Sequence, residues 1–357
     1  MTGLSCCYEY MKKYINIIAF YLPQFHVIKE NEAIYGKNFT EWNNVIHARK
    51  LYDWHYQPHI PHKDFGYYNL LDEDFIIKQH NIAYNYGINC FCYYYYNMSG
   101  RPLLFEPLHI INKNNIIKNR FCLCWAHHSW YYNRDNKYKI FIKQDYKINN
   151  IEYIVSDISK YMLNKRYIKI DGKPLFIIFS PEKIPNAQEY IDAFRYYIKK
   201  TFIKEILIAG VEAFADVEPS ALGLDFMIEF APNWVNDALL SPSGTYPRIY
   251  DYNKTVNFMI HKDIPNYIRL RCAFPGWDNT PRRGNDGIIF RGANTKTFKL
   301  HLEYLKEYTS LLQPKGYNYI FINAWNEWGE SCHLEPDMQN GYAYLKAVQS
   351  VFTLHSF

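Results

Sequence analysis

Short runs of apolar residues recur along the 357-residue chain, and stretches with helical periodicity separate most of them. The apolar runs cover residues 15–21, 88–95, 121–125, 174–179, 206–211, 225–230, 267–274 and 319–323. Helical patterns cover residues 73–86, 151–164, 188–201 and 297–312, and a last one at 341–354 follows the eighth run. Short, continuous apolar strands that alternate with helices are typical of parallel strands covered on both faces.

Eight strand–helix units predict an α/β fold, a single (β/α)8 TIM barrel over residues 1–357. The remaining residues would form long βα loops, chiefly 23–69 and 231–266, and loops of such length are usually functional. An open, doubly wound sheet is the alternative. The first run, however, is followed by Leu22-Pro23-Gln24 and not by the glycine-rich turn of that fold.

The composition of the chain excludes several classes of protein. Apolar residues make up 48% of the chain, which provides for a large core and excludes a disordered protein. The net charge of +5 comes from dispersed lysines without a basic stripe, so we expect no nucleic-acid partner. The apolar stretch at 15–22 is interrupted by Asn16 and too short for a membrane span, and no small-residue cleavage site follows it. We therefore expect no membrane span and a cytoplasmic location; the oligomeric state is left open.

The eight cysteines include two C-x-C pairs, Cys90/Cys92 and Cys122/Cys124. Each pair lies in a strand-like run, where residues two apart share a face and pack as small apolar side chains. Their spacing is shorter than the spacing of zinc knuckles. We therefore expect free thiols in the core, which suits a reducing compartment, and no metal or other cofactor.

Aromatic and hydrogen-bonding residues gather where the predicted strands end, and a barrel carries its active site at the carboxyl ends of its strands. These residues are Tyr21, Gln24 and His26 at the first strand, Tyr95 at the second, Trp125, His127, His128 and Trp130 at the third, Glu229 at the sixth, Trp277 and Asp278 at the seventh, and Asn326 and Trp328 at the eighth. Aromatic faces stack on sugar rings, and polar side chains bind hydroxyl groups. The pattern therefore indicates a glycan or polysaccharide substrate. The alternative is that the tryptophans cap the barrel and the polar groups satisfy loop backbones.

The stretch NAWNEWGE, residues 323–330, alternates Trp325 and Trp328 with Glu327 and Glu330 directly after the eighth strand. Glycosidic bond cleavage uses two carboxyl groups, one ionised and one protonated. Residues at i and i+3 of a helical turn lie about 5–6 Å apart at Cβ, which favours the close spacing of a retaining pair. Nearby indoles lower the local polarity and so raise the pKa of one carboxyl. A solvated E-x-x-E pair is the plainer alternative.

Several stretches together resemble the WbsX-type carbohydrate-active proteins, a group similar to glycoside hydrolase family 99. They are FYLPQFH (20–26), FTEWNNV (39–45), HYQPH (55–59), DGKPLF (171–176), PGWDN (275–279), WNEWGE (325–330), LEPD (334–337) and GYAYL (341–345). The resemblance implies a TIM barrel related to endo-acting α-mannosidases. It also implies that Glu327 assists attack by the sugar's own 2-hydroxyl, that Glu330 is the general acid/base, and that no metal takes part. Within the shared motifs, Glu41 and Trp42 join the predicted substrate-binding residues.

The chain departs from this group at two strand ends. Trp125-Ala-His-His-Ser-Trp130 stands where the group often has W-A-N-E-x-W, and Tyr93-Tyr-Tyr-Tyr96 replaces its usual Y-Y-H-Y. The sugar preference of relatives is therefore not carried over. The sequence predicts a retaining, endo-acting α-glycosidase or transglycosidase.

Two other functions stay open. The first is a glycosyltransferase of surface-polysaccharide biosynthesis, in which Asp72-Glu-Asp74 would bind a metal–diphosphate. The same string is also typical of a helix N-cap and first turn. The second is a non-catalytic glycan-binding barrel. His55, His59 and His62 suggest a metal site, but they lie among prolines and are expected to form hydrogen bonds within a loop.

Overall fold

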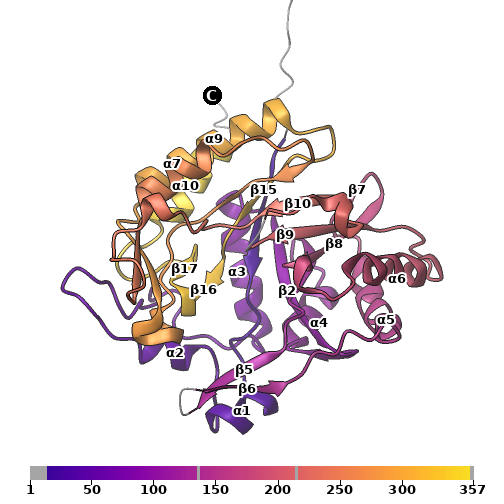
Figure 1. The fold of residues 1–357 in the computed structure, drawn as a ribbon, viewed down its shortest axis with the longest axis horizontal. Coiled ribbons are helices and arrows are strands. Elements are labelled where there is room, and N and C mark those ends of the chain that lie inside the picture. The colour runs from indigo at the N-terminus through magenta and orange to yellow at the C-terminus, as the bar shows by residue number, and fades with distance from the viewer. Residues whose placement is uncertain (1–13, 135–136, 214–215, 354–357) are drawn as a thin grey trace, which may run out of the picture.

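A computed structural model describes residues 14–134, 137–213 and 216–353. Its main sheet is a parallel wall with the order β12–β10–β9–β8–β4–β2–β1–β15–β13. The bounds are β1 Asn16–Tyr21, β2 Cys90–Met98, β4 Arg120–Trp125, β8 Lys173–Phe179, β9 Leu207–Glu212, β10 Phe226–Glu229, β12 Arg269–Leu270, β13 Cys272–Ala273 and β15 Tyr319–Ile322. These strands curve around a common axis in Figure 1. The predicted barrel and the position of each of its strands are confirmed.

The seventh apolar run closes the barrel. It forms two short strands, β12 and β13, separated only by Arg271. β12 pairs with β10, and β13 pairs with β15, so the two ends of the strand order are consecutive segments of one extended stretch. The predicted single strand at residues 267–274 therefore occupies one strand position in the barrel wall, and Arg271 interrupts it.

The helices confirm the predicted periodicity to within a few residues. The predicted ones are α3 Glu73–Asn85, α5 Asn150–Met162, α6 Ala187–Lys199, α9 Thr295–Leu312 and α10 Ala343–Phe352. The Asp72 carboxylate accepts a hydrogen bond from the Phe75 amide at 3.1 Å, so Asp72 is the N-cap of α3. Within the described residues, no helix combines the length and apolarity needed to cross a bilayer.

The connections between the strands of the wall carry further helices and short strands. Their helices are α1 Lys29–Tyr35, α2 Trp42–Ile46, α4 Glu106–Lys113, α7 Tyr252–Ile260 and α8 Thr280–Arg283. Their strands are β3 Arg101–Leu103, β5 Trp130–Arg134, β6 Lys137–Ile142, β7 Lys169–Ile170, β11 Arg248–Asp251, β14 Ile288–Arg291, β16 Asn326–Glu327 and β17 Cys332–His333. The hairpin β5–β6 and the helices α1 and α2 lie together at one end of the barrel in Figure 1. The predicted loop 231–266 therefore contains a helix, α7, as well as β11.

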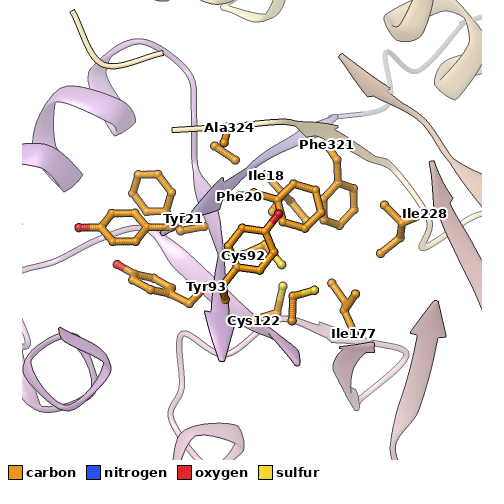
Figure 2. Packing of buried hydrophobic residues seen from close by; sticks show 14 of the residues in the cluster. Ile18, Phe20, Tyr21, Cys92, Tyr93, Cys122, Ile177, Ile228, Phe321 and Ala324 are labelled. Carbon is orange, nitrogen blue, oxygen red and sulfur yellow. The ribbon is translucent and has the colours of Figure 1, made fainter. Parts of the chain in front are cut away.

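Strand residues alternate strictly between the barrel interior and the surrounding helices. Phe20 packs against Phe321 with ring centroids 5.4 Å apart, whereas the next residue, Tyr21, packs against Tyr93 at 4.4 Å on the opposite face. Figure 2 shows the two groups on opposite sides of the strands, with Cys92 and Cys122 among the interior residues. Together with Cys90, Cys124, Cys272 and Cys332 these thiols are buried and free, which confirms the expectation of core thiols; Cys6 and Cys7 lie outside the described residues.

Glu229, expected from the sequence to bind substrate, instead lies in a buried ion pair outside the barrel interior. Its carboxylate is 2.7 Å from Nε of Arg271, and both side chains are nearly inaccessible. The Arg271 guanidinium also covers the ring of Tyr308 on α9 at 4.9 Å and donates to the Met259 carbonyl of α7. The pair therefore joins the interrupted seventh strand to the helical layer, and the prediction for Glu229 is wrong.

Substitution of Glu229 tests this structural role. Glu229→Gln leaves the buried Arg271 charge without its partner, so the free energy of unfolding should fall by about 3–5 kcal/mol. The double variant Glu229→Gln/Arg271→Met should recover much of that loss. Glu303→Gln, which removes an exposed carboxylate 3.8 Å from Lys299, is the matched control and should change stability by less than about 1 kcal/mol. Urea denaturation measures all three, and an unaltered midpoint for Glu229→Gln would contradict the assignment.

Candidate active site

The two glutamates after the eighth strand lie on a tight turn. β16 pairs with β17 in antiparallel fashion, with Glu327 opposite Cys332. Between these strands the chain makes one turn of 3₁₀ helix from Trp328 to Glu330, and Ser331 adopts a left-handed conformation with φ of 47°. The turn gives Glu327 and Glu330 the i, i+3 relation that places side chains on one face.

Arg282 binds both of these glutamates and a third one. Its Nη2 lies 2.7 Å from Glu327 Oε2, and its Nη1 lies 2.8 Å from Glu330 Oε1. Its Nε lies 2.6 Å from Oε1 of Glu41, the residue preceding α2. Loops after the first, seventh and eighth strands thus meet at one guanidinium. We refer to Glu41, Arg282, Glu327 and Glu330 as the carboxylate cluster.

The electrostatics of the cluster give its carboxyl groups different states. Burial, reinforced by the charge of Glu327 and opposed by Arg282, raises the pKa of Glu330 to about 8. Burial also raises the pKa of Glu327, against the lowering effect of Arg282 and with a further rise from Glu41. Glu330 is therefore the carboxyl that holds a proton at neutral pH. When protonated it can still accept the Arg282 hydrogen bond through its carbonyl oxygen.

A buried network fixes the turn from below. Glu335 accepts hydrogen bonds from Trp328 Nε1 at 2.6 Å and from the Tyr68 hydroxyl at 2.8 Å, and Gln79 of α3 donates to its other oxygen. Burial raises the pKa of Glu335 to about 7. Asn326 both accepts from the Leu22 amide at 2.7 Å and donates to the Leu22 carbonyl at 3.0 Å. Trp328 and Asn326 therefore position the turn and do not face the groove.

A groove with a volume of about 530 Å³ opens in front of the cluster. Gln24, Glu41 and Trp130 line it as the sequence predicted, and Arg282 lines it as well. Aromatic side chains of α1 and of the β5–β6 hairpin, Tyr35 and Phe141 among them, form its far wall. Glu330 keeps 20% of its side chain exposed and Glu327 keeps 7%, so the guanidinium lies between the groove and most of their surface.

Three of the predicted aromatic residues face the helices and not the groove. The Tyr95 hydroxyl donates to Asp157 of α5 at 2.7 Å, and the Tyr21 hydroxyl donates to Gln79 of α3 at 2.7 Å. Trp125 stacks on Tyr190 of α6 with centroids 6.0 Å apart. These predictions are wrong because a strand alternates its faces, so a residue one position away from the interior faces outward.

Tyr96, which the sequence interpretation passed over, occupies the interior position beside Tyr95. It is half-buried and packs against Trp130 with centroids 5.4 Å apart. Its pKa is raised by burial first and then by the charge of Glu327, with Arg282 opposing, so its hydroxyl lies within the field of the cluster. The alternation of β2, once its register is known, places Tyr96 on the interior face, in contact with the groove residue Trp130.

The remaining predicted residues are held by neighbours away from the cluster. His26 lies 3.1 Å from Glu106, and His127 lies 2.7 Å from the Tyr146 hydroxyl. His128 stacks on His127 with centroids 4.3 Å apart and remains half-buried. These three histidines are thus held in the loops around the strand ends, and none of these contacts joins them to the glutamates.

Trp42 is buried and packs against Trp328 with centroids 5.5 Å apart. Trp277 and Asp278 line a second cavity of about 350 Å³, where the Asp278 carboxylate lies 2.6 Å from both His55 Nε2 and Gln57 Nε2. Neither Trp277 nor Asp278 lines the groove in front of Arg282. The structure thus separates the predicted residues of the seventh strand end from those of the first and third.

The fold is a parallel barrel, and the paired glutamates follow its last strand, at the end where barrel enzymes carry their active sites. Residues 17–348 match the model of the family described as Glycosyltransferase WbsX. The chain belongs to this family, as the resemblance in its motifs implied.

Two curated relatives extend the comparison. The uncharacterized protein WxcX of Xanthomonas campestris pv. campestris strain B100 is 32% identical over 345 residues, which cover 94% of this chain and 49% of the relative. The same protein of strain ATCC 33913 aligns with the same identity and coverage. This chain thus spans about half the length of the curated relatives it matches.

Solved structures share the fold. The glycoside hydrolase family 99 endo-α-mannosidase from Bacteroides thetaiotaomicron aligns with a TM-score of 0.59 and 15% identity over 94% of this chain and 96% of that one. A glycoside hydrolase-like protein aligns with a TM-score of 0.63 and 14% identity over 96% and 94% of the two chains. At these identities the likeness concerns the barrel and its connections.

The opposite faces of Tyr95 and Tyr96 give a matched pair of variants. Tyr96→Phe should lower kcat/KM by roughly fivefold, because a hydroxyl that binds substrate contributes on the order of 1 kcal/mol. Tyr95→Phe should leave kcat/KM unchanged and lower the free energy of unfolding by about 1 kcal/mol, through loss of its bond to Asp157. Kinetics and urea denaturation on both variants test the assignment. Equal kinetic losses would contradict the inward orientation of Tyr96.

The raised pKa of Glu330 also makes the stability depend on pH. Its pKa rises from an ordinary 4.5 to about 8, so the folded protein holds a proton that the unfolded chain releases between these values. This contribution to stability is complete below pH 4.5 and is lost as the pH rises through 8. Glu330→Gln should therefore melt at a higher temperature than wild type above pH 8, with little difference near pH 5. A Tm difference that stays constant from pH 5 to 9 would show that Glu330 ionises normally.

Proposed function

We propose that this chain cleaves or transfers glycosidic bonds of a polysaccharide or glycan as a retaining, endo-acting α-glycosidase or transglycosidase. One observation carries the proposal: Glu327 and Glu330 bind neighbouring nitrogens of the same guanidinium, and burial raises the pKa of Glu330 to about 8. The shared guanidinium supports a close pair of carboxyl groups, as retaining enzymes require. The shifted pKa supplies the protonated member of that pair at neutral pH.

The two glutamates take complementary parts in the reaction. Glu330 gives its proton to the glycosidic oxygen as the bond to the anomeric carbon breaks. Glu327 accepts the proton of the sugar's 2-hydroxyl, whose oxygen bonds to the anomeric carbon and closes a 1,2-anhydro ring. Water or a sugar hydroxyl then opens the ring, giving its proton to Glu330, while Glu327 returns a proton to the 2-oxygen. Both glutamates end in their starting states.

The charge of the cluster favours this reaction over transfer from a sugar diphosphate. Three carboxyl groups surround the Arg282 guanidinium, and with Glu330 protonated two negative charges still exceed its positive one. Arg283 and Asp286, which also line the groove, carry opposite charges and leave this excess in place. A diphosphate would be repelled from such a site unless cations screened it. Asp72, the first aspartate of the D-x-D string, is engaged as the N-cap of α3. Both observations support a glycan donor without an attached nucleotide.

The groove supports an extended substrate. It runs from Arg282 to the β5–β6 hairpin and α1, and Trp130, Tyr35 and Phe141 give it aromatic walls. Aromatic rings stack on the apolar faces of sugar rings, so the walls can bind any of several sugar units along a glycan. An endo-acting enzyme needs such contacts on units beyond the one that reacts. A non-catalytic binding barrel would share these walls, so the variants below distinguish the two functions.

Paired substrates separate the roles of the two glutamates. Glu330→Gln should lower the rate on natural glycans by about 10²–10⁴-fold, because an alcohol leaving group needs a proton. On an aryl glycoside or glycosyl fluoride the same variant should keep much of its first-step rate. Glu327→Gln should lose activity on both substrates, since closure of the 1,2-anhydro ring always needs its base. Initial rates on each substrate, with a melting curve for each variant, measure the difference.

Glu303→Gln on α9 serves as the matched control, because its carboxylate is exposed and far along the chain from the turn. It should retain wild-type rates on both substrates. If both active-site variants lost equal activity on both substrates, the separate roles of Glu327 and Glu330 would be contradicted. If the wild-type protein binds a glycan but cleaves no bond in it, the result favours the non-catalytic barrel.

A further inference from the structure

Two histidines and an aspartate converge behind the turn that carries the glutamates. The nearest ligand atoms of His59, His333 and Asp337 all lie within 4.8 Å of one another. His59 comes from the loop after β1, His333 from β17, and Asp337 from the segment before α10. His333 and Asp337 are buried and His59 is half-buried. His59 and His333, which lie 274 residues apart in the chain, thus each present one ring nitrogen to the same point as a carboxylate oxygen of Asp337.

The surroundings of His333 fix the tautomer that a metal ion requires. Its Nδ1 lies 2.8 Å from the backbone carbonyl of Glu335, so Nδ1 carries the hydrogen and Nε2 presents a lone pair toward His59. Its ring stacks on Trp328 with centroids 3.7 Å apart and an interplanar angle of 17°, which fixes its orientation. A histidine whose second nitrogen donates to a carbonyl is the usual arrangement around a metal ion.

The carboxylate of Asp337 is oriented in a comparable way. The backbone amide of Asn340 donates to Oδ1, and the Asn340 side chain donates to Oδ2 at 3.0 Å. Each carboxylate oxygen has a second lone pair, so these bonds hold the group in place and leave it able to coordinate.

The three side chains line the second cavity, whose volume is about 350 Å³. This cavity gives an ion a route from solvent and leaves room for a water ligand. His59 Nδ1 and His333 Nε2 lie 2.8 Å apart, a hydrogen-bond distance. Two imidazole ligands at about 2.0–2.1 Å from a tetrahedral zinc ion lie roughly 3.3 Å apart. A small rotation of the half-buried His59 ring, with its hydrogen moved from Nδ1 to Nε2, would therefore convert the hydrogen-bonded pair into a coordinating one.

We propose that His59, His333 and Asp337 bind a divalent transition-metal ion of the zinc class, with water as the fourth ligand. Two imidazole nitrogens and one carboxylate select zinc, cobalt or nickel over magnesium and calcium, which prefer oxygen ligands alone. The ion joins the loop after β1 to β17 and to the segment before α10. Through the stacked pair of His333 and Trp328 it holds the turn of Glu327 and Glu330 from behind. The role is structural and does not depend on the proposed reaction.

Metal titration of the full chain tests this site. The protein, freed of any affinity tag, carries Cys6→Ser and Cys7→Ser so that these two thiols do not contribute. Zinc is titrated against a chromogenic chelator, and cobalt is followed by its visible absorption. The expected result is one ion per chain, an intense cobalt spectrum of low coordination number, and a Tm that rises with zinc concentration. His333→Gln and Asp337→Asn should each weaken binding by tenfold or more.

His62→Gln is the matched control, because His62 lies in the same loop and is 3.2 Å from Asp64, outside the proposed ligand set. It should bind zinc like the parent protein. Asp337→Asn is nearly isosteric, so it separates loss of a ligand from loss of folding, which circular dichroism monitors. The proposal is overturned if the parent binds no stoichiometric zinc, or if Asp337→Asn and His62→Gln bind it equally well. Glycosidase activity is not a readout, so failure here leaves the proposed reaction untouched.

Discussion

The guanidinium of Arg282 holds together three carboxyl groups that the fold brings from different loops. Without it, Glu41, Glu327 and Glu330 would repel one another at the mouth of the barrel, and two of them could remain close only if one took up a proton. With it, the guanidinium opposes the effect of burial, which still raises the pKa of Glu327 and raises that of Glu330 to about 8. The division into acid and base that we propose rests on this shortage of positive charge in a partly desolvated place.

The parts below the cluster show how this is maintained. Asn326 binds both backbone groups of Leu22, so the loop after the eighth strand is fastened to the loop after the first. Glu335 collects donors from Trp328, Tyr68 and Gln79 and so fixes the underside of the turn to α3. None of these residues lines the groove in front of Arg282, but each holds a loop in place. A rigid second layer of this kind is what allows loops to carry closely spaced charges.

The periodicity of the sequence was sufficient to predict the barrel, because eight apolar runs have few other ways to be covered on both faces. It could not assign faces at the strand ends. Tyr95 was chosen where Tyr96 faces the interior, since a shift of one residue reverses every side chain and nothing local in a row of four tyrosines fixes the register. Arg282 was missed because its role exists only once three distant carboxylates surround it. Glu229 was misplaced because a buried carboxylate and a substrate-binding one look alike until the partner, Arg271, is seen.

The interruption at Arg271 gives the barrel a seam. β12 shares only two register pairs with β10, and β13 only two with β15, whereas β2 and β4 share six. The wall therefore has its shortest strand pairings beside the strand whose loop carries α8 and Arg282. Arg282, which lies between the groove and the two glutamates, thus follows the wall position with the shortest pairings. The buried pair of Glu229 and Arg271 compensates there, because it ties that position to the helical layer through side chains where backbone pairing is short.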